Sequence, residues 1–506
     1  MILHGRYCVH SVSKLFLKSV ASPPCTEPLY TKPGSKWLKF LLSRRIAVTS
    51  FVTCFVTYSV SIYLLVNSHA YGSDDSEILS ATPQGLQVSS PAFSTEQKRN
   101  NTSYSKELSR LNRELKAKMA FAAVRPDSWL HLSGVAEAYF ERARLSGNFR
   151  DYSAALNTLQ KVFALVDNGN GPVLLRARLN YSLHRLPAIE SDLLTAESAL
   201  LINKSAIAQI DGIRADVMLQ QGQYKEARQI YDELEKSYPS STSAIRTAQA
   251  YVYTGDYEEA ERWFALAGDR APRRSAQLRS WIELQTGILY LEQGRLNEAL
   301  VHYQHALELF PGYWLVEEHI AEIDALQGRT DKAKLAYRNL INRTGSPLFM
   351  IALAEILLQG GELAKKESVT LLEKADHIYA TMASQIPEAI AGHALEHFLQ
   401  RGIPKQALQL AMDNYLLRSG GPSAVLLAQA HTVNGQLSEA SAILDKLLTT
   451  QYRSADLHVT ASIVYRALGF NDRADHQQQL ARAINPDAVA GGDWLLRKLK
   501  AVGTLH

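Results

Sequence analysis

The sequence predicts an all-α protein built as a superhelical array of helix pairs, preceded by one N-terminal transmembrane helix. Seven glycines are each followed five residues later by an alanine, at successive spacings of 33, 39, 34, 74, 33 and 34 residues. One helical unit of about 34 residues therefore recurs, with a degenerate copy in the long gap. The pairs are Gly222/Ala227, Gly255/Ala260, Gly294/Ala299, Gly328/Ala333, Gly402/Ala407, Gly435/Ala440 and Gly469/Ala474.

Each glycine is expected to end the first helix of a pair, because glycine adopts the left-handed conformation that satisfies the last carbonyls of a helix. The alanine then marks a place where two helices cross so closely that only a methyl group fits. A bulky apolar residue follows the glycine by nine positions in most copies and fills the space between neighbouring pairs: Tyr231, Phe264, Tyr303, Tyr337 and Leu444.

The best copy, Trp281 to Pro311, reads WIELQTGILYLEQGRLNEALVHYQHALELFP. With Gly287 and Tyr290 in its first helix and Ala299 and Tyr303 in its second, it resembles a tetratricopeptide repeat. The resemblance implies a right-handed superhelical array of antiparallel helix pairs that acts as a non-catalytic scaffold or adaptor for other proteins. Along the chain it implies repeats over 205–486, an entry helix and degenerate repeats over 104–204, and a C-terminal capping helix over 487–506.

The resemblance also places the binding surface, since the first helices of such arrays line a concave groove that takes partner segments. The Lys and Asn pattern that holds a partner's terminal carboxylate in some family members is missing, so an extended segment with bulky and basic residues suits the groove better. The opposing interpretation is that the groove is only solvated and that contact occurs elsewhere. The candidate partner-binding residues are Ile245, Gln249, Tyr253, Trp281, Leu284, Ile288, Glu318 and Glu322.

Residues 46–66 contain no charged side chain and are long enough to cross about 30 Å of hydrocarbon as a helix. Arg44 and Arg45 precede this stretch, and residues 1–66 hold eight basic residues against one acidic residue. The positive-inside rule then assigns residues 1–45 to the cytoplasm and the array to the other side of the membrane.

This assignment predicts a single-pass protein of the inner (plasma) membrane of a bacterial cell envelope. Residues 67–103, rich in Ser, Thr, Gln, Asn and Pro, are predicted to be a flexible linker. Cleavage after Ala70, at a small-x-small site, would instead release the array into the periplasm. The partners expected are envelope or membrane proteins. Nucleic acid is not expected, because the basic excess lies outside the array.

One string suggests catalysis: His393, Glu396 and His397 match the H-x-x-E-H pattern of zinc peptidases. The alternative to a scaffold is therefore a zinc-dependent hydrolase. The string falls within the first helix of a repeat, so a solvated helix face is the expected explanation, and the same is expected of Glu318, His319 and Glu322. The sequence thus predicts no enzyme activity, no metal and no cofactor.

Overall fold

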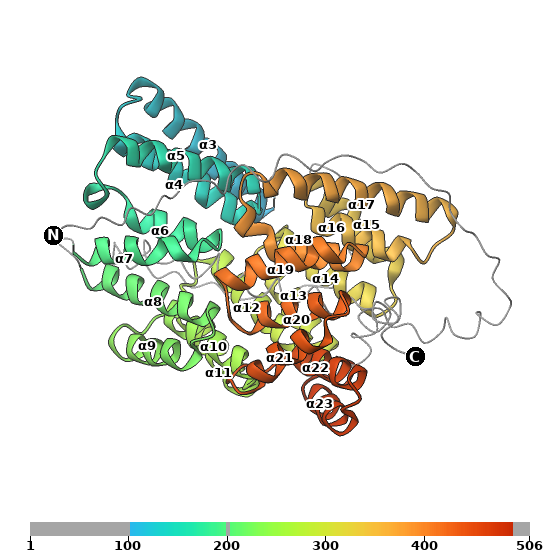
Figure 1. Cartoon of the computed structure of the whole chain (residues 1–506). Coiled ribbons are helices and arrows are strands. Elements are labelled where there is room, and N and C mark those ends of the chain that lie inside the picture. The colour runs from blue at the N-terminus through green and yellow to red at the C-terminus, as the bar shows by residue number, and fades with distance from the viewer. Residues whose placement is uncertain (1–101, 199–202, 489–506) are drawn as a thin grey trace, which may run out of the picture. The chain divides into compact units, whose positions relative to one another are not determined.

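The computed structural model describes residues 102–198 and 203–488, and every regular element in them is helical (Figure 1). The elements are α3 (Ser103–Val124), α4 (Trp129–Ser146), α5 (Phe149–Leu165), η3 (Asn168–Asn170), α6 (Val173–Ser182), η4 (Leu186–Ala188), α7 (Ile189–Glu197), α8 (Lys204–Gln220), α9 (Tyr224–Ser237), α10 (Ser241–Thr254), α11 (Tyr257–Arg270), α12 (Ala276–Glu292), α13 (Leu296–Leu309), α14 (Trp314–Leu326), α15 (Thr330–Thr344), α16 (Pro347–Leu357), α17 (Glu362–Ala383), α18 (Pro387–Arg401), α19 (Pro404–Leu417), α20 (Gly421–Val433), α21 (Leu437–Leu448), α22 (Ala455–Ala467) and α23 (Asn471–Ile484).

The predicted cytoplasmic segment (1–45), the predicted transmembrane helix (46–66) and nearly all of the predicted linker (67–103) lie outside the described residues, as does the predicted capping helix from 489 onwards. Within the described ranges, no helix has the length and apolar character needed to cross a membrane.

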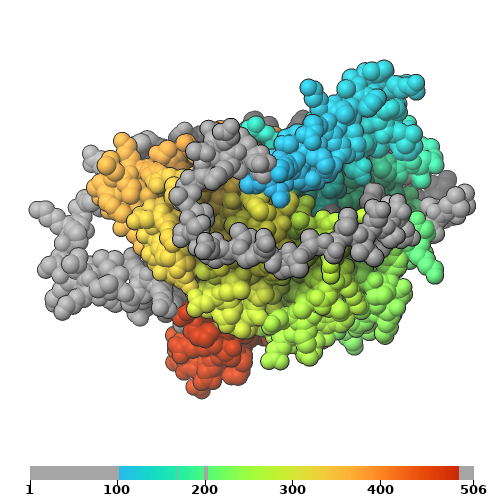
Figure 2. All heavy atoms as spheres, turned by 180° about the vertical axis from the view of Figure 1, so that it is seen from behind, coloured from blue at the N-terminus to red at the C-terminus, as the bar shows by residue number. Residues whose placement is uncertain are grey.

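Consecutive helices pack as hairpins that stack in chain order. Each even-numbered helix from α8 to α22 packs against the odd-numbered helix that follows it, and α4 packs in the same way against α5. Adjacent hairpins also touch, for example through α9 and α10 or α11 and α12. In the space-filling view, the green and yellow segments accordingly lie next to one another in chain order (Figure 2). α16 and α17 occupy the long gap in the glycine pattern.

The turn glycines and the crossing alanines have the local geometry that such hairpins need. All seven glycines have a positive φ, between 74° and 82°. At the crossing of α12 and α13, a Cβ atom added to Gly287 would lie 2.3 Å from Cε1 of Tyr303. The short side chains thus set how closely the two helices of a pair approach. The seven alanines are all fully buried: Ala227, Ala260, Ala299, Ala333, Ala407, Ala440 and Ala474.

The first helix of each pair is much more deeply buried than the second. α12 buries twelve of its 17 residues, whereas α13 buries only Ala299, Tyr303 and Ala306. The even-numbered helices from α8 to α22 therefore form an inner layer. We use the term inner face for the positions six and ten residues before the turn glycines of this layer.

The array also packs against itself across about 200 residues of sequence, which a repeat period does not encode. The backbone N–H of Gly420 donates to the carbonyl of Gln220 (2.9 Å), and that of Arg453 donates to the carbonyl of Tyr253 (3.0 Å). We call these contacts between α8–α10 and α20–α22 the seam. Three tyrosine rings meet there, with centroids 5.8–6.1 Å apart: Tyr224, Tyr253 and Tyr452.

Candidate functional site

The eight candidate partner-binding residues lie on three neighbouring first helices, α10, α12 and α14, and all eight are buried. Trp281 is 1% exposed and Leu284 is fully buried, and both belong to the largest apolar core of the array. Tyr253 lies at the seam. The structure thus gathers these residues on adjacent helices, but a partner reaches them only if neighbouring parts of the array move apart.

The predicted repeat alanines lie elsewhere, on the second helices of their pairs, and they form no part of a binding surface. Each occupies a helix crossing and has no exposed surface, so its methyl group contacts the array alone. Their role is packing. These alanines are Ala227 on α9, Ala260 on α11, Ala299 on α13, Ala333 on α15, Ala407 on α19, Ala440 on α21 and Ala474 on α23.

One buried acid on the inner face has a complete set of partners. Asp216 on α8 forms an ion pair with Arg246 of α10, with Nη2 and Oδ2 2.9 Å apart. Its Oδ1 also accepts a hydrogen bond from the hydroxyl of Tyr231 (2.9 Å). Such pairing offsets the large cost of removing a carboxylate from water. This repeat therefore shows how the array stabilises a buried acid.

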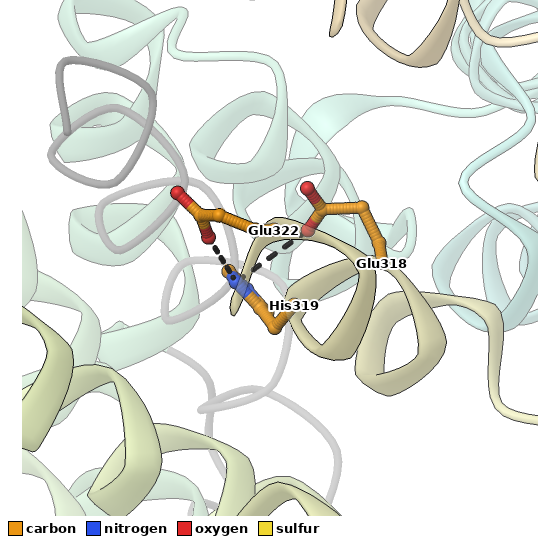
Figure 3. Close-up of side chains that lie close together, drawn as sticks. All are labelled: Glu318, His319 and Glu322. Carbon is orange, nitrogen blue, oxygen red and sulfur yellow. Dashed lines mark hydrogen bonds and ion pairs between the residues drawn. The ribbon is translucent and has the colours of Figure 1, made fainter. Parts of the chain in front are cut away.

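The acids of α14 have a different environment, and the expectation that they are solvated is wrong. Glu318, His319 and Glu322 are 6%, 1% and 2% exposed. His319 Nδ1 lies 3.1 Å from Oε2 of Glu322 and 3.5 Å from Oε2 of Glu318 (Figure 3). Burial raises the pKa of Glu318 to about 7 and that of Glu322 to about 8. It also lowers the pKa of His319.

Further acids of the inner layer are half-buried. Burial raises the pKa of Glu292 on α12 and of Glu355 on α16 to about 8. Burial also raises the pKa of Glu396 on α18, and the negative charges of Asp456 and Glu355 raise it further. The inner layer therefore gathers carboxyl groups close enough to influence one another, which makes it a candidate site for cationic ligands.

The sequence contained a signal for these acids that the repeat alignment did not use. Glu322, Glu355 and Glu396 each lie six residues before a turn glycine, in three consecutive hairpins. Glu355 was missed because its glycine, Gly361, lacks the alanine five positions later. Acids at the same position of three successive hairpins are expected to lie side by side, and we call these three glutamates the acidic strip.

The H-x-x-E-H string does not form a compact set of ligands. His397 contacts Asp376 of α17 through Nε2, whereas the pKa of His393 falls to about 4 because of burial and the charge of Arg418. Both histidines are buried, so the expected solvated helix face is wrong too. Among residues 102–198 and 203–488, the three side chains whose geometry suits a metal ion are Glu318, His319 and Glu322.

Comparison with protein families gives one match, to the tetratricopeptide repeat, over residues 208–275. This segment contains most of α8 and the whole of α9, α10 and α11, so the chain contains tetratricopeptide repeats in this part of the array. No curated protein matches the chain.

Several solved structures resemble the chain at low identity. The Cut9–Hcn1 hetero-tetramer of APC/C matches with 14% identity and a TM-score of 0.36, covering 80% of this chain and 85% of that one. A tetratricopeptide repeat protein from Parabacteroides merdae matches with 18% identity and a TM-score of 0.31, covering 51% and 97%. Human IFIT1 matches with 14% identity and a TM-score of 0.37, covering 70% and 89%. Similarity at this level supports no inference about function.

Proposed function

We propose that this protein is a non-catalytic scaffold that binds other proteins through its helical array. The observation that carries the proposal is the tetratricopeptide match over residues 208–275 within a longer series of stacked hairpins. Arrays of this kind present long surfaces on which partner segments bind. The hairpins of such an array are stabilised by packing on their neighbours, and binding a partner requires no catalytic group.

The partner segment is extended, and it carries basic and bulky residues. The supporting observation is the acidic strip of the inner face, Glu322, Glu355 and Glu396, whose pKa values are all raised by burial. A guanidinium or ammonium group inserted between these carboxyls would favour their ionised form and pair with it. The apolar candidates, Trp281 and Ile288, would bind the bulky side chains.

Access to this face requires the seam to part. The seam is held by backbone hydrogen bonds, by the three tyrosine rings and by an apolar core that α8–α10 share with α20–α23. Its opening leaves the hairpins themselves folded, so it requires less free energy than global unfolding. A partner that binds only the open array shifts the equilibrium towards that form.

The scaffold acts as an adaptor in the cell envelope, anchored by residues 46–66 and with its array on the extracytoplasmic side. The uncharged stretch, the arginines before it and the acids Asp74, Asp75 and Glu77 after it support this placement. Its partners are then envelope or membrane proteins. Cleavage after Ala70 would leave the array on the same side, as a periplasmic protein.

The test measures peptide binding by fluorescence anisotropy with the full chain. The probe is an alternating Arg and Leu dodecapeptide, and its counterpart has Glu in place of Arg. We expect the Arg probe alone to bind, and the double variant Glu355→Gln, Glu396→Gln to weaken it about tenfold or more, because charge-assisted contacts are lost.

The matched control removes two charges from the exposed surface of α17, in the variant Glu362→Gln, Glu373→Gln. It should bind the Arg probe as the parent does. Equal binding of both probes, or an equal loss in the two double variants, would rule out recognition by the inner face.

A further inference from the structure

The cluster on α14 brings three metal-binding groups together within one helix. Glu318, His319 and Glu322 each offer a ligand atom, and these atoms lie within 4.8 Å of one another. Figure 3 shows the two carboxylates on either side of the imidazole. In a tetrahedral zinc site, ligand bonds of about 2.1 Å place neighbouring donor atoms about 3.4 Å apart. The separations from His319 Nδ1, 3.1 Å and 3.5 Å, are close to this spacing.

The cluster has unused capacity to bind a cation. Oε2 of Glu318 and Oε1 of Glu322 are buried, and neither accepts a hydrogen bond from any described residue. No arginine or lysine of the described ranges forms an ion pair with either glutamate, in contrast to the pairing of Asp216 with Arg246. A buried acid without such a partner carries a large desolvation cost.

A second observation comes from Tyr303, on the neighbouring helix α13. Its ring stacks on that of His319, with centroids 5.3 Å apart and planes inclined by 21°. Tyr303 is fully buried, and its hydroxyl has no hydrogen-bond partner among the described residues. Burial raises the pKa of this phenol, and the charges of Glu322 and Glu318 raise it further, so its oxygen lies within their electrostatic reach. A buried hydroxyl without a hydrogen bond, together with one such oxygen on each of the two carboxylates, indicates a missing ligand.

We propose that Glu318, His319 and Glu322 bind a divalent transition-metal ion, with Zn²⁺ as the best match to two oxygen donors and one imidazole nitrogen. A bound ion displaces the protons that burial retains on the two acids, and the two carboxylates then balance its divalent charge. An imidazole binds metal ions in its neutral form. The ion has a structural role, since it joins three side chains of α14 on the inner face.

The site shares Glu322 with the acidic strip, but the zinc proposal does not rest on the scaffold function. A protein that binds zinc here without binding basic peptides, or the reverse, would separate the two proposals.

The experiment uses the untagged full chain after treatment with a chelator. Titration with ZnCl₂ in a calorimeter, together with metal analysis of the dialysed product, should give one tightly bound ion per chain. The variants His319→Gln and Glu322→Gln should each lower the affinity about tenfold or more, because each removes one ligand. Absence of bound zinc from the parent protein would overturn the proposal.

A second acid and histidine cluster, in the preceding hairpin of α12 and α13, provides the matched control. Glu283 lies 2.8 Å from Nδ1 of His302 and 3.1 Å from Nδ1 of His305. These histidines are more exposed than His319, so the double variant His302→Gln, His305→Gln should retain the zinc affinity of the parent. Zinc binding that is lost in this control and retained in the His319 variant would refute the assignment.

X-ray absorption at the zinc edge of the parent protein tests the same assignment without any variant, in case the α14 variants do not fold. We expect a shell of nitrogen and oxygen atoms with a single imidazole. A sulfur ligand, which would come from Cys8, Cys25 or Cys54, or a shell with two or more imidazoles would overturn the proposal.

Discussion

At the scale of single residues, the array depends on small side chains at helix crossings and on acids that it shields from water. The sequence identified the first group well, because a glycine or alanine at a fixed register has a direct steric reason. It did not identify the second group. Glu318 and His319 are polar, and polar residues usually lie at the surface, so the pattern alone favoured solvation.

Gly287→Ala should destabilise the protein by about 1–3 kcal/mol through overpacking. The new methyl group would lie 2.3 Å from Tyr303, which is fully buried and cannot move aside. The better helix propensity of alanine stabilises the helix by only about 1 kcal/mol, so the variant is less stable than the parent. Urea denaturation followed by circular dichroism measures it.

Gly134→Ala is the matched control for this change, within the helix α4. There the nearest atom to an added Cβ is Cδ of Lys118, at 3.7 Å, which is an ordinary contact. This variant should be as stable as the parent or more stable. Equal destabilisation at both positions would show that the crossing of α12 and α13 is not tightly packed.

The glutamates with raised pKa values make stability fall as the pH rises. Glu292 and Glu355 have a pKa of about 8 in the folded protein against an ordinary 4.5. Between these values the unfolded chain has lost the proton that the folded chain keeps, so unfolding becomes easier. The urea midpoint should therefore decrease from pH 5 to pH 8.5. The double variant Glu292→Gln, Glu355→Gln should show a shallower decrease, and an unchanged slope would contradict the raised pKa values of these acids.

At the scale of helices, the repeat period encodes how each hairpin packs on the next but not how distant hairpins meet. The seam joins residues about 200 positions apart, such as Gln220 and Gly420, and no spacing within one repeat predicts this contact. The candidate groove residues are buried for a related reason. Their helix and register could be deduced from the glycines, whereas their exposure depends on packing beyond the neighbouring repeats.

Gly420→Ala should weaken the seam without disrupting any hairpin. A Cβ atom at this position would lie 2.6 Å from the backbone oxygen of Gln220, so α20 and α8 must separate. Hydrogen exchange of the amides in α8–α10 and α20–α22 should become faster, with the other helices unchanged. Binding of the basic peptide probe should become tighter, since the inner face opens more often.

Gly361→Ala provides a close control, because Gly361 has the same position before a helix and almost the same backbone angles as Gly420. An added Cβ atom there meets no atom within 4 Å. Its exchange pattern should equal that of the parent. If both variants exchange alike, the seam does not limit access to the inner face.

At the scale of the whole molecule, the all-helical prediction is confirmed for the described residues, and the tetratricopeptide resemblance is confirmed for residues 208–275. Both follow from local chemistry that repeats along the chain. Membrane attachment stays a prediction, because it depends on residues 46–66 and on the charges that flank them.

The topology prediction can be tested in cells with reporters fused after Asp75. A reporter that is active only outside the cytoplasm should be active at this junction, because Arg44 and Arg45 hold the N-terminal side of residues 46–66 in the cytoplasm. Moving both arginines to the other side of the uncharged stretch should reduce that activity, whereas exchanging them for lysines should preserve it, since the rule depends on positive charge. Activity of a strictly cytoplasmic reporter at the same junction would place the array in the cytoplasm and remove the envelope from the proposed function.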